Sequence, residues 1–291
     1  MKVIVGFVII LLVVFGGFIM HGGTLGGVVK LSEILIIFGA GIGGMIISTN
    51  VLTLKLMLKQ IAQCFKKNPY NKEFYKELMA LNYQLIREKS RGGMKDLENH
   101  IENVDSSSVF EKYPLVKNDA LVTQFIVDAY RVFILSANKM SAHDFESQLD
   151  EEIMVIEEEL EKPSHKLAAM AESLPGIGIL AAVMGIILAM GGLDAGVAQI
   201  GTNIAAALVG TFTGIFGCYC LFAPLAGSIG EVAKEQTVPF HCVKSIVFAF
   251  SQGHSAEFCA NAARKHIESH DKPDFEELSD HLRNTKVAAE G

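Results

Sequence analysis

The chain has 291 residues, of which half are hydrophobic and only 20% are charged. This balance excludes an ordinary soluble globule and favours a polytopic membrane protein with a substantial soluble part. The formal net charge is −7, but the charged residues avoid the apolar runs and crowd into two segments, so the overall acidity identifies no partner. The five cysteines form no CxxC pair and are interpreted as free thiols.

The first apolar run, Val3–Met20, is long enough to cross a bilayer as a helix. It is long for a signal peptide and no A-x-A cleavage site follows it, so we interpret it as a retained span. A second, somewhat shorter span is predicted at Ile34–Ser48, after a short glycine-rich loop. Glu33 lies just before this run, and we expect it at the outer end of the second span.

The composition changes sharply at residue 53, and residues 53–166 are charged, with apolar side chains at the three-four spacing of amphipathic helices. Many lysines and arginines follow the second span, so by the positive-inside rule this segment is cytoplasmic. Further helices are predicted at 120–135 and 145–161, the second ending before Pro163. The apolar spacing is clearest in two sets: Leu54, Met57, Leu58, Ile61 and Phe65, then Phe74, Leu78, Leu81 and Leu85.

Two more apolar runs, Leu174–Gly192 and Ile204–Ala226, each have about the 20 residues that cross ~30 Å of hydrocarbon. Pro175 and Pro224 lie near the same predicted membrane face, and each removes a backbone donor where lipid supplies no replacement. Small residues recur at every fourth place in both runs, which lets helices pack closely. We therefore expect these spans to associate tightly with other helices.

No ionisable residue lies in the middle of any of the four runs. A transporter normally keeps a carboxylate in the membrane to carry the ion, whereas this chain offers only hydroxyls there, chiefly Thr211 and Thr213. Either the chain conducts nothing or a partner helix supplies the acid. A plainer interpretation of Thr211 is a hydroxyl that bonds to the carbonyl four residues earlier in its own helix.

Sequence motifs of enzymes are absent: the chain has no Walker lysine motif, no GxSxG and no HExxH. His266 and His270 have the four-residue spacing of two metal ligands on a helix, with Glu268 between them. No third ligand is evident and the tail is very polar, so a solvated helix face is the preferred interpretation. We therefore predict no catalytic residue, no metal and no cofactor.

The tail after residue 229 returns to a charged, helical composition, and we place it in the cytoplasm together with both termini. The predicted fold is an all-α membrane protein with four transmembrane helices, a large helical cytoplasmic insert and a helical cytoplasmic tail. The expected domains are a first transmembrane hairpin at 1–50, the insert at 51–167, the third and fourth spans at 168–228, and the tail at 229–291.

Two long motifs resemble one known family. The segment ALVGTFTGIFGCYCLFAPLA, residues 207–226, resembles the fourth-span signature of MotA, the flagellar stator subunit. SLPGIGILAAVMGII, residues 173–187, is similar to the third-span motif of the same family. Shorter likenesses extend this resemblance over nearly the whole chain, at MHGGTLG (20–26), LENHIEN (97–103), DEEI (150–153) and KPDFEELSDHLR (272–283).

The resemblance implies a stator subunit of the flagellar motor in the bacterial inner membrane. In the family, MotA subunits ring the single span of a MotB partner, whose aspartate binds the translocated ion, with five MotA-type chains around two MotB-type chains. The cytoplasmic insert then pushes on the rotor protein FliG through charged residues. The implied partners are thus MotB, FliG, further copies of the chain and membrane lipid, with no nucleic acid.

The resemblance also assigns roles to residues of the third and fourth spans. Pro175 and Pro224 match the two prolines that couple protonation of the partner acid to movement of the insert. Thr211 matches the hydroxyl that faces the ion path. Ala182 lies where sodium-driven relatives carry a threonine, and a methyl group offers no oxygen to sodium. The implied coupling ion is the proton rather than sodium.

For the rotor contact, Glu98 matches the acidic torque residue of the family. The family has an arginine eight residues before it, but this chain has Ser90 there, flanked by Lys89 and Arg91. A residue missing from the Gly92–Gly93 turn would make Arg91 the counterpart, and we expect Arg91 to act with help from Lys89. The plainer interpretation of these charges is a solvated helix face.

Two alternatives stay open. An energiser of the related ExbB/TolQ type would share the third and fourth spans but has three spans, whereas this chain has a first pair of closely spaced runs. A membrane scaffold that conducts nothing would tolerate substitution of Pro175 and Thr211.

Overall fold

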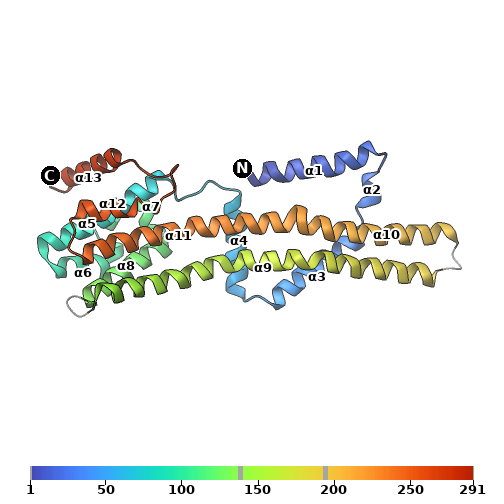
Figure 1. Ribbon diagram of the computed structural model, residues 1–291, viewed down its shortest axis with the longest axis horizontal. Coiled ribbons are helices and arrows are strands. Elements are labelled where there is room, and N and C mark those ends of the chain that lie inside the picture. Colours follow the sequence, from blue (N-terminus) through green and yellow to red (C-terminus); the bar gives the residue numbers. More distant parts are fainter. Residues whose placement is uncertain (1, 137–139, 193–195, 291) are drawn as a thin grey trace. The chain divides into compact units, whose positions relative to one another are not determined.

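The computed structural model describes residues 2–136, 140–192 and 196–290, and within these ranges all regular structure is helical (Figure 1). The predicted all-helical character is confirmed for this part of the chain. Residue contacts divide the chain into two compact units. We call residues 2–67 and 159–233 the span unit, and residues 68–158 and 234–290 the insert unit.

The span unit contains every strongly apolar helix that the structure describes. Three helices are long and apolar enough to cross a membrane: α1, α9, and the continuous helix over Val197–Ser251. The second predicted span, Ile34–Ser48, corresponds to α3, an apolar helix of 17 residues. The elements are α1 (Lys2–Met20), α2 (Leu25–Val28), α3 (Leu31–Ile47), α4 (Val51–Cys64), and parts of α9 (Ala142–Gly191), α10 (Val197–Phe216) with the π-helical segment Gly217–Phe222, and α11 (Ala223–Ser251).

The predicted helix end before Pro163 is wrong, because α9 continues through Pro163 and Pro175 for 50 residues. A proline inside a helix removes one backbone donor and strains the turn before it. Within the span unit, bonds from side chains support the turn at Pro163. Gln60 Nε2 donates to the Leu160 carbonyl at 2.9 Å, and Ser164 Oγ donates to the Ala226 carbonyl at 2.8 Å.

The stretch between the third and fourth predicted apolar runs is partly helical, because residues 197–203 belong to helix α10. The loop before the second span contains the short helix α2. Asp194, which follows the third apolar run and is expected in a loop, lies outside the described residues.

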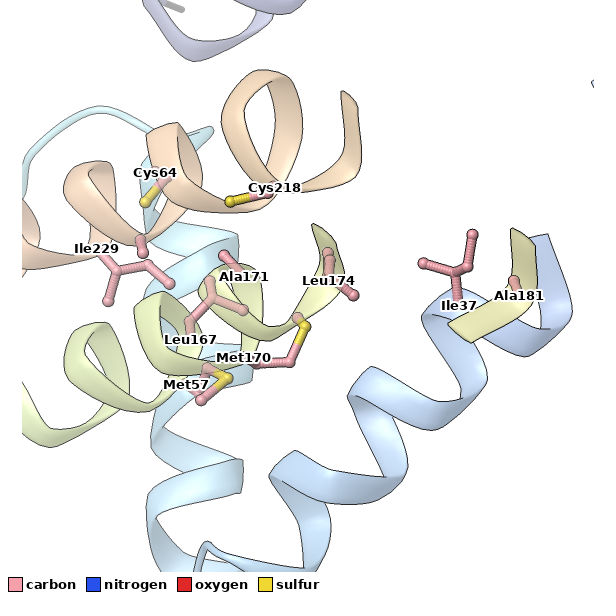
Figure 2. Packing of buried hydrophobic residues seen from close by; sticks show 11 residues of the cluster. Ile37, Met57, Cys64, Leu167, Met170, Ala171, Leu174, Ala181, Cys218 and Ile229 are labelled. Carbon is pink, nitrogen blue, oxygen red and sulfur yellow. The ribbon is translucent and has the colours of Figure 1, made fainter. Parts of the chain in front are cut away.

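A small buried cluster holds the span unit together (Figure 2). Met57 of α4 lies against Leu167 and Met170 of α9, while Ile37 of α3 lies beside Ala181 of α9. The ribbon of α4 runs across α9 rather than along it (Figure 2).

The insert unit is built from the amphipathic helices that the sequence predicts. Helix α5 begins after Asn71, whose side chain accepts from the backbone N–H of Phe74, and ends before Gly93, whose φ of +86° a side chain would strain. The other elements are α6 (Met94–Glu102), η1 (Val104–Ser106), η2 (Phe110–Lys112), α7 (Pro114–Lys117), α8 (Ala120–Ser136), α12 (Ala256–Ala263), α13 (Phe275–Glu290) and the adjoining parts of α9 and α11. The periodic set Phe74, Leu78, Leu81 and Leu85 is buried, as predicted.

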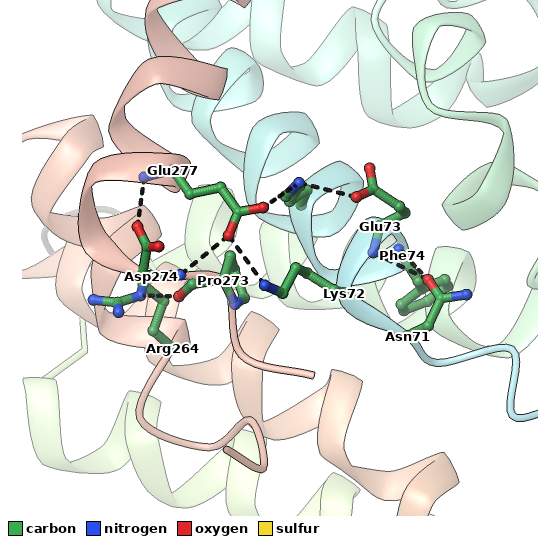
Figure 3. Close-up of polar contacts among 9 residues, drawn as sticks. Asn71, Lys72, Glu73, Phe74, Arg264, Pro273, Asp274 and Glu277 are labelled. Atoms are coloured by element: carbon green, nitrogen blue, oxygen red, sulfur yellow. Dashed lines mark hydrogen bonds and ion pairs between the residues drawn. The ribbon is translucent and has the colours of Figure 1, made fainter. Parts of the chain in front are cut away.

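Ion pairs attach the tail helix α13 to α5 (Figure 3). Glu277 pairs with Lys76 at 2.6 Å and with Lys72 at 3.2 Å, and Lys76 also pairs with Glu73 at 2.9 Å. The bonds from Lys76 and Lys72 hold the pKa of the Glu277 carboxyl at about 2. Nearby, Arg264 Nε donates to the Pro273 carbonyl at 2.9 Å. The tail helix is therefore held by these ion pairs together with its buried residues Leu278 and Leu282.

Candidate functional site

Helices α9 and α10 meet backbone to backbone. A Cβ built on Gly214 would lie 2.5 Å from the Leu174 carbonyl oxygen, and one on Gly178 would lie 2.9 Å from the Gly210 carbonyl oxygen. No side chain fits between the helices at this crossing, which explains the small residues at every fourth place. The small residues at this crossing therefore pack the two helices of one chain against each other, and the association of these spans with further helices stays a prediction.

Pro175 follows Leu174 directly and so lies at this crossing, half-buried. Its missing N–H leaves the Ala171 carbonyl without its helical donor. Pro224 has a different environment: it is exposed and follows the π-helical segment, where Ala223 N donates to the Cys218 carbonyl five residues back. A π turn absorbs one extra residue and shifts the hydrogen-bond ladder just before a residue that cannot donate.

The two prolines therefore have different neighbours. Pro224 lines a groove of about 190 Å³ with Ser228 and the first turns of α1, including Lys2, Phe7 and Ile10. Pro175 packs at the α9–α10 crossing. The roles that the resemblance gives to both prolines stay predictions.

Thr211 is half-exposed, and its hydroxyl makes no hydrogen bond with any residue in the described part of the chain. The bond to the carbonyl four residues earlier, the plainer interpretation, is therefore not formed. By contrast, the Thr202 hydroxyl on the same helix donates to the Ala198 carbonyl at 3.0 Å. Thr211 lies on an outward stripe, at helical spacing, with the exposed residues Ile204, Leu208, Ile215 and Tyr219.

Glu33 lies in the first turn of α3, the end of the second span at which the sequence predicted it. Its side chain is buried there, with 7% of it exposed. Its Oε2 atom is buried without a hydrogen-bond partner among the described residues. A Cβ on Gly210 would lie 2.9 Å from this oxygen, so the carboxyl sits against the bare backbone of α10. A carboxyl group that the sequence reasoning left out of the site therefore lies beside the residue that precedes Thr211.

A signal for this site was present in the sequence. A carboxylate at the start of an apolar run is costly unless it turns toward protein. Gly210, the residue before Thr211, is the small residue that leaves room for it. What the sequence could not supply is the pairing of α3 with α10.

Ala182 meets the same turn of α10. Its backbone nitrogen lies 3.5 Å from the Cβ position of Gly210, and the Ala181 methyl lies 3.4 Å from it. The structure thus brings Glu33 and Ala182 to Gly210, next to Thr211. Pro175 lies seven residues from Ala182 along α9, a rise of about 10 Å.

Arg91 and Glu98 are both exposed, on the consecutive helices α5 and α6 of the insert unit. Neither forms a hydrogen bond or ion pair with the residues that the structure describes. Lys89 differs, because it is half-buried with its ammonium group 5.1 Å from the centre of the Phe250 ring. Of the two bases beside Ser90, Arg91 is the one with a free charge.

An ion pair missed by the sequence reasoning fixes α6. Arg131 of α8 binds Glu102 through two hydrogen bonds of 2.7 Å each, and also pairs with Asp128 at 3.1 Å. Leu97 and Ile101 bury the inner face of α6. Nothing in the sequence spacing points to a pair 29 residues apart.

His266 and His270 do not share a helix, because α12 ends at Ala263. The His266 ring shares a 2.6 Å hydrogen bond with Ser245, and burial beside His241 lowers its pKa. Among the described residues, no group of three possible ligands is placed to hold a metal ion.

Comparison with known proteins identifies the class first. The sequence model described as "Motility protein A N-terminal" matches residues 4–93, and the "MotA/TolQ/ExbB proton channel family" matches residues 117–240. The class is therefore that of membrane proton channels, and not of enzymes.

Similar proteins then identify the family. "Chemotaxis protein LafT" of Vibrio parahaemolyticus is 41% identical over 278 residues, which covers 96% of this chain and 97% of that protein. "Motility protein A" of Escherichia coli is 37% identical over 286 residues, with 98% and 96% covered. The chain belongs to the motility protein A family, as the resemblance implied.

Two solved structures share the fold. MotAB from C. jejuni gives a TM-score of 0.70 at 21% identity, covering 93% of this chain and 96% of that chain. The flagellar MotAB stator complex from Bacillus subtilis gives a TM-score of 0.62 at 21% identity, covering 93% and 98%.

Proposed function

We propose that this chain is the channel subunit of a flagellar stator and that, with a MotB-type single-span partner, it converts proton flow into torque on the rotor protein FliG. The observation that carries this proposal beyond family membership is the free hydroxyl of Thr211 on an outward, otherwise apolar stripe of α10.

The stripe fits a partner helix. In hydrocarbon, an unsatisfied hydroxyl facing lipid is unfavourable, and polar side chains in spans normally face other helices. A partner helix that brings an aspartate would satisfy Thr211 and supply an ion site in the same contact. By likeness to the family, five such chains enclose two partner spans.

Glu33 adds a second protonatable group close to this path. It lies against Gly210, and Thr211 is the next residue of α10. Among the side chains that meet this turn, the carboxyl of Glu33 is the one that exchanges protons. Ala182 contributes no side-chain oxygen, and sodium would need several oxygens in place of its water shell. The arrangement therefore favours the proton over sodium.

The membrane arrangement follows the same proposal. The chain crosses the bacterial inner membrane four times with both termini in the cytoplasm, α3 being the short second span. The basic residues after α3 support this orientation. Arg91 and Glu98, exposed on the insert unit, form the rotor-facing charges, where contacts act by long-range steering.

The experiment replaces the native gene with Thr211→Ala or Pro175→Ala variants and scores swimming and flagellar filaments. We expect filaments that are present but paralysed or slow. Thr202→Ala is the matched control for the hydroxyl, because Thr202 already bonds within its helix. Pro163→Ala is the control for a proline inside α9. Normal swimming of both Thr211→Ala and Pro175→Ala would contradict the proposal and favour a non-conducting scaffold.

A further inference from the structure

Helix α4 follows α3 after a gap of three residues and has one protein-covered face. Thr53, Met57, Gln60 and Cys64 are buried, and Gln60 Nε2 bonds to the Leu160 carbonyl of α9 at 2.9 Å. This bond and the Met57 contacts hold α4 across α9 (Figure 2).

The opposite face of α4 is apolar yet uncovered. The exposed fractions are 65% for Val51, 77% for Leu52, 68% for Leu58 and 40% for Phe65. The sequence spacing grouped Leu58 and Phe65 with the buried Met57, and the structure corrects this. Four exposed apolar side chains on one short helix indicate that something covers them.

Lysines accompany the apolar residues on the same outer face. Lys55, Lys59 and Lys66 are exposed, and no Asp or Glu occurs anywhere from residue 34 to residue 72. At about 100° per residue, Val51, Leu58 and Phe65 fall in one strip about 40° wide, and the three lysines fall in the adjacent strip of similar width. The outer face therefore has an apolar edge and a purely cationic edge.

The position of α4 matches a membrane boundary. It crosses α9 at Leu160–Met170, just before the apolar stretch of α9 that begins at Leu174. It also directly follows the apolar helix α3. A helix with a narrow apolar edge and lysines beside it is typical of the membrane interface.

We propose that α4 lies in the headgroup region of the inner leaflet, with Val51, Leu58 and Phe65 among the lipids and Lys55, Lys59 and Lys66 binding anionic phospholipids. Lysine stems cover apolar surface while their ammonium groups reach phosphates, and polybasic segments beside a span attract anionic lipid. A second copy that pairs its own α4 face with this one fits less well, because lysines would then lie against lysines.

The test uses the full chain, with its partner, in lipid nanodiscs. The sequence contains no tryptophan, so Leu58→Trp introduces a single reporter. We expect its fluorescence to be quenched by brominated phosphatidylglycerol more strongly than by brominated phosphatidylcholine. Adding Lys55→Gln or Lys59→Gln should lower this preference about fivefold each, the ratio that corresponds to roughly 1 kcal/mol per lysine at an anionic surface.

Two controls define the comparison. Leu115→Trp places the reporter at an exposed apolar position of the insert unit and should be quenched by neither lipid. Lys112→Gln with Lys265→Gln removes two exposed lysines elsewhere and should leave the Leu58→Trp preference unchanged. No quenching of Leu58→Trp, as expected if another protein surface covers α4, would overturn the proposal, and so would equal quenching by both lipids. The inference rests on the proposed inner-leaflet placement, but its readout needs no proton flow, so either idea can fail alone.

Discussion

At the scale of single residues, Gly210 organises the candidate ion path. The missing side chain lets the Glu33 carboxyl touch the backbone of α10, while Thr211, the next residue, keeps its hydroxyl unbonded. A larger residue at position 210 would separate α3 from α10. The position of the Glu33 carboxyl therefore depends on this glycine.

Glu33→Gln keeps the size of the side chain and removes its ability to exchange a proton. We expect proton flux through the assembled channel to fall about tenfold or more, because a positioned acid or base contributes at least this factor to the rate of a proton transfer. Swimming speed and flux into vesicles measure the effect. Glu172→Gln, at an exposed carboxylate of the same unit, is the control. Flux equal to that of the native chain would remove Glu33 from the path.

Gly214→Ala tests the backbone contact of α9 with α10. Its Cβ would lie 2.5 Å from the Leu174 carbonyl oxygen, so the helices must separate. Overpacking of this kind costs about 1–3 kcal/mol. Gly201→Ala, on the same helix with nothing within 4 Å, should be neutral or slightly stabilising. Thermal unfolding of the two variants in detergent measures the difference. Equal melting temperatures would contradict the close approach.

At the scale of elements, the amphipathic helices were predictable because their burial follows a simple period. Helix α8 matches the helix predicted at 120–135, α1 matches the first predicted span, and α5 buries the predicted set Phe74, Leu78, Leu81 and Leu85. The passage of α9 through Pro163 was not predictable, since it depends on neighbours such as Gln60 and Ser164 that are distant in sequence.

The candidate site was predictable only in part, for the same reason. Family motifs named Thr211 and Pro175, but the burial of Glu33 requires knowing that α3 packs on α10. The sequence spacing grouped the outward apolar side chains of α4 with the buried ones. Lipid and protein both attract apolar side chains, and periodicity alone does not distinguish the two.

The tail helix gives a pH prediction at this scale. The pKa of Glu277 falls from 4.5 to about 2 on pairing with Lys76 and Lys72. The stabilisation of α13 by the Glu277 carboxylate is therefore complete above about pH 4.5, and it is lost as the pH falls toward 2. Hydrogen exchange of α13 should accelerate over this range, and Glu277→Gln should abolish the change. Glu276→Gln, at an exposed neighbour, should keep it. The same acceleration in Glu277→Gln would assign the pH effect to other groups.

At the scale of the whole molecule, this member of the motility protein A family consists of an apolar span unit and a charged insert unit. The span unit leaves an apolar stripe with one free hydroxyl, and the insert unit leaves Arg91 and Glu98 free. We assign the first to contact with a MotB-type partner and the second to contact with the rotor. Glu33 lies enclosed behind α10, so the chain alone is expected to hold no open path for protons.

The most direct measurement is proton flux into vesicles that contain this chain alone or together with its MotB-type partner. We predict negligible flux from the chain alone, clear flux with the partner, and reduced flux when the chain carries Thr211→Ala. Flux from the chain alone at the rate of the complex would contradict the claim that a partner completes the channel.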